Sequence, residues 1–501
     1  MKLKNIFQPL LMFTCAAVAL CSCKKKLDTN LTNPNAVAVT GISGKDVFAG
    51  ALVNTVNIVN VNSISYINQE WMGYWARTTS YSASGQQFRI ETFSLNNADG
   101  DNFWDAAYHN IYDYDFVEKN STSGSILPGA SLTMKVLMFQ DLADVFGNIP
   151  YSQAINPNDT AVSYDDASTI YTGLVSQIDS AMGLINKSAA TSDDAADIMF
   201  QGDKSKWLSF ANTIKLRLLL RQIPNISAAS ALQAEAASTA AYGYLSAGTD
   251  ATINPGFADA VTQQSPFWGS YGFQVGGVNA YQNHTFYIAC QTFIDYLNAT
   301  SDPRLGYLFA KSPSGTYGGN YFGDGGSTLK LSSQLSPIGA GILKSASMPA
   351  VIMTASEGLF LQAEAAQRGL IPGTFMTLFN TAVAESFRFL GIDNSVSVAA
   401  SFISTSTDDR VNPAVASDPI KTIIYQKWVA NAEIDPLESW CDYRKTGYPD
   451  RTNPSINPSV SSNTVPKRFL YPQSEIDVNN TNYSSQHQIA SDIYTKIFWA
   501  K

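Results

Sequence analysis

Two pairs of carboxylates have a spacing at which acid–base chemistry can be considered. Glu357 and Glu364 are seven residues apart, which puts both on one face of a helix, and Asp141 and Asp144 are three apart. Glycoside hydrolases use two carboxyl groups roughly 5–10 Å apart across a cleft. Because two carboxylates on one helix do not make a cleft, the spacing favours helix-capping or solvated roles over a catalytic pair.

The residues that could bind a metal or a cofactor are few. The three histidines, His109, His284 and His487, are far apart, and no His-Glu-x-x-His or Cys-x-x-Cys pair is present. The sequence also lacks a Gly-x-Ser-x-Gly elbow and a complete phosphate-binding loop. The turn Asn96–Asp101 is rich in oxygen ligands but lacks the closing glutamate of a calcium loop, so we interpret it as a polar turn, with calcium binding as the alternative. We expect no catalytic residue, no metal site and no cofactor.

Aromatic residues make up 12% of the chain, and they include 24 tyrosines and 8 tryptophans. Flat rings with polar edges suit ligands such as sugars or peptides. Between about 243 and 350 the helical pattern lapses, and a long irregular insertion with this aromatic content is typical of a binding region. The candidate ligand contacts are Tyr81, in an earlier loop, and Trp268, Tyr271, Tyr317 and Tyr321 in the insertion.

The charge balance argues against binding to nucleic acid. The chain carries a net charge of -9, from 32 basic and 41 acidic residues, and its longest basic run is Lys24–Lys26. Such a balance opposes contact with a phosphate backbone. Hydrophobic residues make up 45% and charged residues only 15%, which predicts a globular protein with an extensive core.

The N-terminus has the features of a bacterial lipoprotein leader. Two lysines precede an uncharged apolar run over residues 6–20, and the small residue Ser22 stands directly before Cys23. An apolar run of about 15 residues is short for a membrane-spanning helix, which needs about 20. We therefore predict a signal peptide over 1–22, lipidation of Cys23 and a flexible tether over 23–44.

Helical periodicity dominates the rest of the chain. Gly147 is suited to end one helix, and the pair Asp165 and Asp166 is suited to begin the next. In a later helix, Lys215, Arg217 and Arg221 lie off the apolar stripe. Paired helices with short connectors predict a mainly α fold, although no strict repeat is present. The apolar stripes are Ile64–Trp75, Trp104–Tyr112, Leu132–Phe146, Ile170–Ile185, Trp207–Leu218 and Ser356–Arg368, and a further helix is expected to start near Pro372–Thr374 and to extend toward Leu390.

Two cysteines besides Cys23 remain in the predicted mature chain. Cys290 and Cys441 could form one disulfide in an oxidising compartment. Both lie among apolar or aromatic residues, where a buried free thiol is an equally good interpretation. No disulfide framework is expected.

Five stretches of the sequence carry motifs that are informative when taken together. They are Asp141–Ala154, Trp207–Arg217, Glu357–Ala366, Glu438–Pro449 and Arg468–Glu475, and Asn479, Asn482 and Tyr483 follow the last of them. In this order, the stretches resemble the SusD/RagB family of nutrient-binding outer-membrane lipoproteins of the Bacteroidota, in its SusD-like branch.

This resemblance implies a fold and a role. The fold would be one α-helical domain over 45–501, in which tetratricopeptide-like helix pairs form a scaffold and the long irregular loops, including the insertion at 243–350, form the ligand surface. The protein would capture a nutrient, a glycan or oligosaccharide, at the outer face of the outer membrane. It would deliver this ligand to a SusC-like TonB-dependent transporter, without catalysis. Trp440, Tyr443 and Arg444 would be packing and ion-pairing residues.

The sequence departs from the family pattern at two places. Lys445 stands where a second arginine is expected, and Lys24–Lys26 follows Cys23 in place of an acidic run of the kind associated with surface export. Two other functions remain open on the sequence. One is a helical scaffold or assembly protein with no small ligand, and the other is an anchored glycan hydrolase that uses the unplaced carboxylates.

Overall fold

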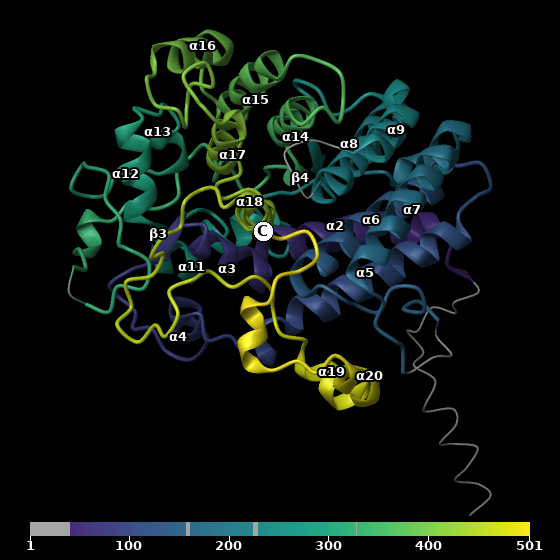
Figure 1. Ribbon diagram of the computed structural model, residues 1–501, viewed down its shortest axis with the longest axis horizontal. Helices are drawn as coiled ribbons and strands as arrows, with labels where there is room; N and C mark the ends of the chain where they lie inside the picture. The colour runs from purple at the N-terminus through teal and green to yellow at the C-terminus, as the bar shows by residue number, and fades with distance from the viewer. Residues whose placement is uncertain (1–40, 157–160, 224–228, 327) are drawn as a thin grey trace, which may run out of the picture. The chain divides into compact units, whose positions relative to one another are not determined.

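Long helices packed side by side form most of the described structure (Figure 1). The computed structural model describes residues 41–156, 161–223, 229–326 and 328–501, and Gly44–Lys501 forms one compact unit. The predicted signal peptide, Cys23 and the tether up to residue 40 lie outside the described residues. The prediction of a mainly α fold built from helix pairs is confirmed.

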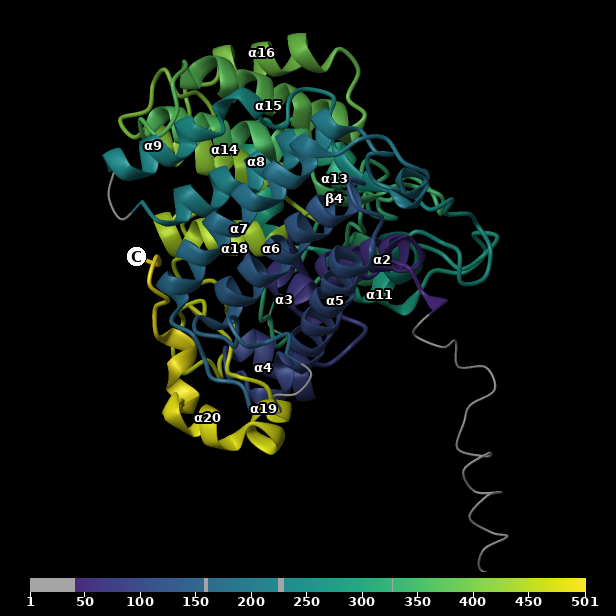
Figure 2. The same cartoon turned by 90° about the vertical axis from the view of Figure 1, so that its right-hand side faces the viewer.

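The first half of the compact unit is a succession of paired helices. Helix α2 packs on α5, α5 on α6, α6 on α7 and α7 on α8. Figure 2 shows α5 to α8 following one another across the unit. The helices of this half are α2 (Gly44–Val61), α3 (Ser63–Trp71), α4 (Gly85–Thr92), α5 (Asp101–Asn120), α6 (Leu127–Phe146), α7 (Ala167–Lys187), α8 (Lys204–Arg221) and α9 (Ser230–Ser238).

The second half returns to paired helices and joins the first. Helix α14 packs on α15, α17 and α8, and α18 packs on α3. These contacts bring helices from opposite ends of the chain into one core. The helices of this half are α14 (Ala355–Gln367), α15 (Phe375–Leu390), α16 (Ser395–Thr405), α17 (Pro419–Ala430), α18 (Pro436–Thr446), α19 (Gln473–Val478) and α20 (Asn480–Ser485).

The insertion at 243–350 consists of short elements held to the helices by two small sheets. Strand β3 pairs antiparallel with β1, so that Trp75 faces Ala289 and Arg77 faces Tyr287. Strand β2 pairs antiparallel with β4. The first sheet fixes the middle of the insertion beside the end of α3. The elements are α10 (Pro266–Tyr271), α11 (Gln282–Phe286), α12 (Gln291–Ala299), α13 (Leu305–Leu308), β1 (Trp75–Arg77), β2 (Ala251–Ile253), β3 (Tyr287–Ala289) and β4 (Ala350–Met353).

Local capping residues set several helix ends. Helix α6 ends at Phe146 because Gly147 takes a φ of 84°, a backbone angle that residues other than glycine rarely adopt. The Asp166 carboxylate begins α7 by accepting a hydrogen bond from the backbone N–H of Ser168 at 2.9 Å. The turn Asn96–Asp101 is also a cap, since the side chain of Asn96 accepts from Ala98 and Arg89 pairs with Asp99 at 2.6 Å. Both oxygens of the Asp99 carboxylate are bonded by Arg89, which supports the interpretation as a polar turn.

A network of buried charges lies where α6, α8, α14, α17 and α18 meet. Arg217 and Arg221 are 3% and 1% exposed, although the sequence places them off the apolar stripe of α8. Arg221 pairs with Glu438 at 2.5 Å, and Lys427 pairs with the same carboxylate at 2.8 Å. Glu364, from the first candidate pair, accepts from Lys445 at 2.8 Å. The C-terminal half of α8 is therefore surrounded by protein on its polar side as well.

The two cysteines of the described residues do not pair. Cys290 and Cys441 are both free and buried. The interpretation as buried thiols therefore holds, and the disulfide alternative is wrong. Burial beside the Asp144 carboxylate raises the pKa of the Cys441 thiol well above its ordinary value.

Candidate ligand-binding surface

The segment from α10 to β3 forms a surface beside the loop that follows β1. Pairing of β1 with β3 brings the two segments together, and the backbone N–H of Thr78 donates to the carbonyl of Phe286 at 2.9 Å. Between α10 and α11 the chain turns back on itself, with a bridge between Phe273 and Ala280. Figure 1 shows α11 and β3 close together. Pairing of β1 with β3 thus positions two loops that are about 200 residues apart in the sequence.

Three rings on this surface form what we call the Trp268 cluster: Trp268, Phe273 and His284. The centroids of Trp268 and Phe273 are 5.7 Å apart, and those of Phe273 and His284 are 4.6 Å apart. The indole N–H of Trp268 donates to the carbonyl of Phe273 at 3.1 Å, which fixes the ring. All three side chains are partly exposed. The cluster is a preformed aromatic surface that solvent reaches.

A second aromatic pair lies next to it along the chain. Tyr81, from the loop after β1, is 5.2 Å from the ring of Phe286, two residues beyond His284. Both rings are partly exposed. Phe273, His284 and Phe286 were not among the residues selected from the sequence. The aromatic residues around the Gly-rich turn 269–277 were the signal that could have identified them.

Tyr271 does not lie on the surface, contrary to its selection as a ligand contact. It is 1% exposed, and its ring is 4.9 Å from Trp75 and 4.8 Å from Phe267. Burial raises the pKa of the Tyr271 hydroxyl. The physical reason is helical spacing: Phe267 and Tyr271 are four residues apart in α10 and share its buried face. Trp268 follows Phe267 in α10 and therefore points to a different side of the helix, where part of its surface is exposed.

Tyr317 and Tyr321 contact charged side chains instead of the rings of the Trp268 cluster. The Tyr321 ring is 39% exposed, and its hydroxyl donates to Asp295 on α12 at 3.4 Å. The Lys311 ammonium lies 6.0 Å from the ring centroid of Tyr317. Among the described residues, no ring contact joins any two of the five candidates. The five residues therefore do not form one continuous platform.

The surface around the Trp268 cluster is largely neutral, although the exposed Asp259 carboxylate accepts from Gln264 at 2.9 Å and from the Gly276 N–H at 3.0 Å. Residues 78–88 and 260–286 include no Asp, Glu, Lys or Arg. Side-chain amides fix the loops: Gln264 donates to the carbonyl of Phe273 at 3.1 Å and accepts from the Tyr281 hydroxyl at 2.8 Å. Such a surface offers aromatic faces and neutral hydrogen-bonding groups, the combination that suits an uncharged polar ligand.

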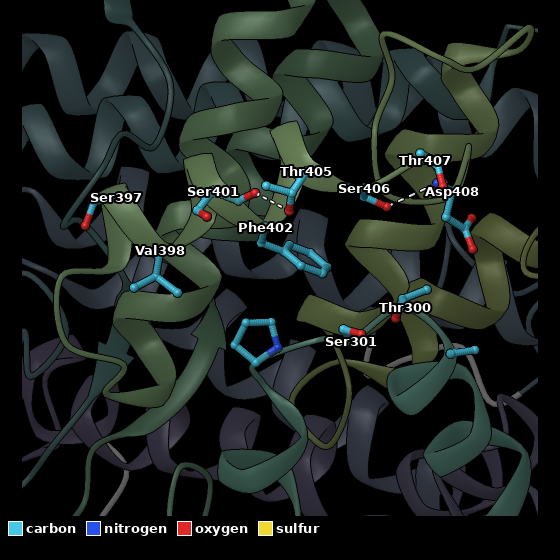
Figure 3. A pocket seen from close by; sticks show the side chains of 12 residues that line it. Thr300, Ser301, Ser397, Val398, Ser401, Phe402, Thr405, Ser406, Thr407 and Asp408 are labelled. Atoms are coloured by element: carbon cyan, nitrogen blue, oxygen red, sulfur yellow. Dashed lines mark hydrogen bonds between the residues drawn. The ribbon is translucent and has the colours of Figure 1, made fainter.

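A separate pocket of about 800 Å³ lies between α16 and the end of α12 (Figure 3). Its α16 wall presents the hydroxyls of Ser397, Ser401 and Thr405, each four residues after the last. The Thr405 hydroxyl donates to the backbone of Ser401 at 2.8 Å, and Phe402 is only 8% exposed. None of the five candidate contacts lines this pocket. It offers hydroxyls without an exposed aromatic face, so the Trp268 cluster is the stronger candidate.

The carboxylate pairs considered for hydrolysis are buried. Asp141 and Glu357 lie 3.6 Å from the Arg217 guanidinium, on either side of it. The Asp144 carboxylate accepts from the Trp499 indole at 3.0 Å and from the Tyr171 hydroxyl. Desolvation raises the pKa of Glu357 well above its ordinary value. These groups form the buried charge network and line no open cleft in the described part of the chain.

Comparison with known proteins places this architecture in a family. A family model described as starch-binding and associating with the outer membrane matches residues 34–472. A chitin-binding SusD homologue from Flavobacterium johnsoniae is 23% identical, with a TM-score of 0.73 over 90% of this chain and 98% of that one. A SusD homologue from Bacteroides uniformis is also 23% identical, with a TM-score of 0.71 over 91% of this chain and 99% of that one.

An outer-membrane protein from Bacteroides vulgatus, whose name links it to nutrient binding, is 19% identical, with a TM-score of 0.75 over 92% of this chain and 100% of that one. A comparison of this sequence with curated proteins found no match. The structural neighbours share the fold, and the family model covers most of the sequence. The chain belongs to the SusD-like family of proteins described as starch-binding and associating with the outer membrane.

Proposed function

We propose that this protein is a lipid-anchored binding protein of the outer membrane that captures a neutral glycan on the surface around Trp268. The observation that carries the proposal is the partly exposed Trp268 cluster, on segments 78–88 and 260–286 that include no Asp, Glu, Lys or Arg. A sugar ring offers C–H groups that pack on an aromatic face and hydroxyls that bond to amides. The family description and the chitin-binding neighbour support a glycan ligand.

The neutrality of the surface supports uncharged saccharides over uronates or sulfated glycans. An acidic glycan would need cationic partners at the point of contact. Residues 78–88 and 260–286 supply none, and Arg77, at the start of this loop, is 7% exposed and paired with Glu91 at 2.9 Å. Tyr81 and Phe286 extend the aromatic surface and are proposed as secondary contacts. Tyr317 and Tyr321 stay as candidate contacts of lower rank because charged neighbours accompany them.

Anchoring and delivery complete the proposed role. Lipidation at Cys23 would hold the protein on the membrane, and the tether up to residue 44 would let the body move relative to it. The ligand would then pass to a SusC-like TonB-dependent transporter. Replacing Cys23 by Ala should release the protein from membranes. Detergent extraction of the wild type from its native membrane should recover that transporter.

The proposed binding function is tested with a panel of neutral and acidic oligosaccharides by isothermal titration calorimetry. The wild type should bind at least one neutral saccharide, and Trp268→Ala should weaken binding by about tenfold or more. Tyr112→Ala is the matched control, since Tyr112 on α5 is 52% exposed and outside the surface. A panel without any neutral ligand contradicts the proposal, and recovery of a protein complex with such a blank panel favours the scaffold function.

The same panel separates binding from hydrolysis. A binding protein leaves the saccharides intact on prolonged incubation. The buried position of Asp141, Asp144, Glu357 and Glu364 supports this expectation. Release of shorter products, abolished by substitution of a single carboxylate, would favour the hydrolase.

A further inference from the structure

His284 has one ring nitrogen held by the protein and the other left for a ligand. Its Nδ1 lies 2.7 Å from the backbone carbonyl oxygen of Tyr271. A carbonyl oxygen only accepts hydrogen bonds, so Nδ1 carries the proton in this contact. In the neutral imidazole the Nε2 atom then has a free lone pair and acts as an acceptor. The backbone of a buried residue thus selects the tautomer.

The Nε2 atom is available on the surface. Among the described residues it has no hydrogen-bond partner, and it is not among the fully buried side-chain atoms that lack one. The imidazole ring lies 4.6 Å from the Phe273 ring, which is in turn 5.7 Å from Trp268. A ligand that extends from Trp268 over Phe273 therefore comes within reach of the His284 imidazole.

The surroundings keep His284 uncharged. Burial lowers the pKa of the imidazole below its ordinary value, and the hydrogen bond to the Tyr271 carbonyl opposes this only in part. Its own helix, α11, carries no acidic or basic group besides His284, and neither does the hairpin that holds Phe273. From the preceding loop, Asp259 is bonded to Gln264 at 2.9 Å and to the N–H of Gly276 at 3.0 Å.

We propose that His284 is a ligand-binding residue whose Nε2 accepts a hydrogen bond from a hydroxyl of the saccharide that lies on Trp268 and Phe273. The proposal rests on the proposed function. The hydrogen bond to Nε2 would orient the sugar, because an aromatic surface alone packs against a sugar ring without fixing how the ring is rotated on it. It also makes binding sensitive to acid, because a ligand that covers Nε2 removes water from the ring and disfavours the imidazolium.

The first test is substitution. His284→Asn retains a donor that can reach the Tyr271 carbonyl but lacks Nε2, so binding of the neutral oligosaccharide found in the panel should weaken by about fivefold. The melting temperature should stay close to that of the wild type. His487→Asn is the matched control, because His487 is exposed and its φ of 50° is one that asparagine tolerates. Its affinity should equal that of the wild type.

The second test uses the wild type alone and does not depend on folding of a variant. Nitrogen-15 NMR of the histidines should show His284 as the Nδ1–H tautomer, and addition of the same oligosaccharide should shift its Nε2 signal. Affinity should fall as pH decreases below 6.5, the ordinary pKa of histidine, and this decrease should be absent in His284→Asn.

The outcomes separate this inference from the proposed function. If the wild type binds no neutral saccharide, both are contradicted. If the wild type binds and Trp268→Ala weakens binding, but His284→Asn binds like the wild type, only the role of His284 is overturned. An Nε2–H tautomer in the free protein would also overturn it.

Discussion

Arg221 on α8 and Glu438 on α18 form an ion pair of 2.5 Å between residues that are 217 positions apart in the chain. Their side chains are 1% and 3% exposed. Lys427 contacts the same Glu438 carboxylate at 2.8 Å and also pairs with Asp442 at 3.0 Å, so two buried cations share Glu438. This contact links the two halves of the helical scaffold at its centre.

Replacing Glu438 by Gln should destabilise the fold strongly. The substitution leaves Arg221 and Lys427 buried without their shared carboxylate, which we expect to cost about 3–5 kcal/mol in the free energy of unfolding. Guanidinium chloride denaturation measures this loss. Lys206→Gln is the control, because its pair with Asp203 is 3.9 Å long and about half exposed, and it should cost only about 0–1 kcal/mol. Equal losses in the two variants would contradict a structural role for the buried pair.

Ionisation of Glu433 should lower the free energy of unfolding as pH rises. The Trp75 indole donates to this buried carboxyl at 2.7 Å, but desolvation raises its pKa to about 8. The unfolded chain ionises near pH 4.3, so between that pH and about 8 the folded state retains a proton that the unfolded state has lost. The contribution to stability is complete below pH 4.3 and decreases by up to about 1.4 kcal/mol per pH unit above it.

Glu433→Gln isolates this effect, because the amide oxygen can still accept from Trp75 while the side chain no longer ionises. Melting temperatures measured from pH 4.5 to 8 should fall less steeply in the variant than in the wild type. The variant should also be the more stable of the two at pH 8. Parallel curves would show that Glu433 is not the source of the slope.

Arg444 should not tolerate replacement by lysine. Its guanidinium lies 3.4 Å from the ring centroid of Trp440, and its Nη1 donates to the carbonyls of Asp144 at 2.6 Å and Lys467 at 2.9 Å. An ammonium cannot keep the planar stacking and both bonds, so Arg444→Lys should lose about 1–3 kcal/mol. The comparison is Arg388→Lys, at a guanidinium that is 37% exposed, which should change thermal stability less. A milder effect at Arg444 than at Arg388 would contradict the packing role.

Trp268 and Tyr271 should respond to substitution in different ways. Tyr271→Ala removes a fully packed core ring and should destabilise the fold by about 3–5 kcal/mol. Trp268→Ala should weaken glycan binding with a much smaller effect on stability, since its ring is partly exposed. Thermal unfolding and titration calorimetry on both variants distinguish these effects. Loss of binding in a stably folded Tyr271→Ala protein would place Tyr271 in the ligand site after all.

Local patterns in the sequence were sufficient to predict most of the helical scaffold. Gly147 ends α6, and Asp166, one of the two aspartates expected to begin α7, caps that helix. Helix α15 covers Phe375–Leu390, where the pattern predicts a start near Pro372–Thr374 and an extension toward Leu390. These features depend on neighbours within about one helical turn, so the backbone conformation follows from adjacent residues. The family resemblance, carried by motifs in a fixed order, is likewise a property of the chain itself.

Only the tertiary structure decided which side chains are buried. Arg217 and Arg221 lie off the apolar stripe of α8, yet they are covered, because α14 and α18 bring the carboxyl groups of Glu357 and Glu438 against them from more than 100 residues later in the chain. Tyr271 is buried for the same kind of reason, since β1 brings Trp75 against it from almost 200 residues away. Composition predicted a binding region in the segment 243–350, whereas the packing around the β1–β3 pair left Tyr271 in the core and Trp268 partly exposed.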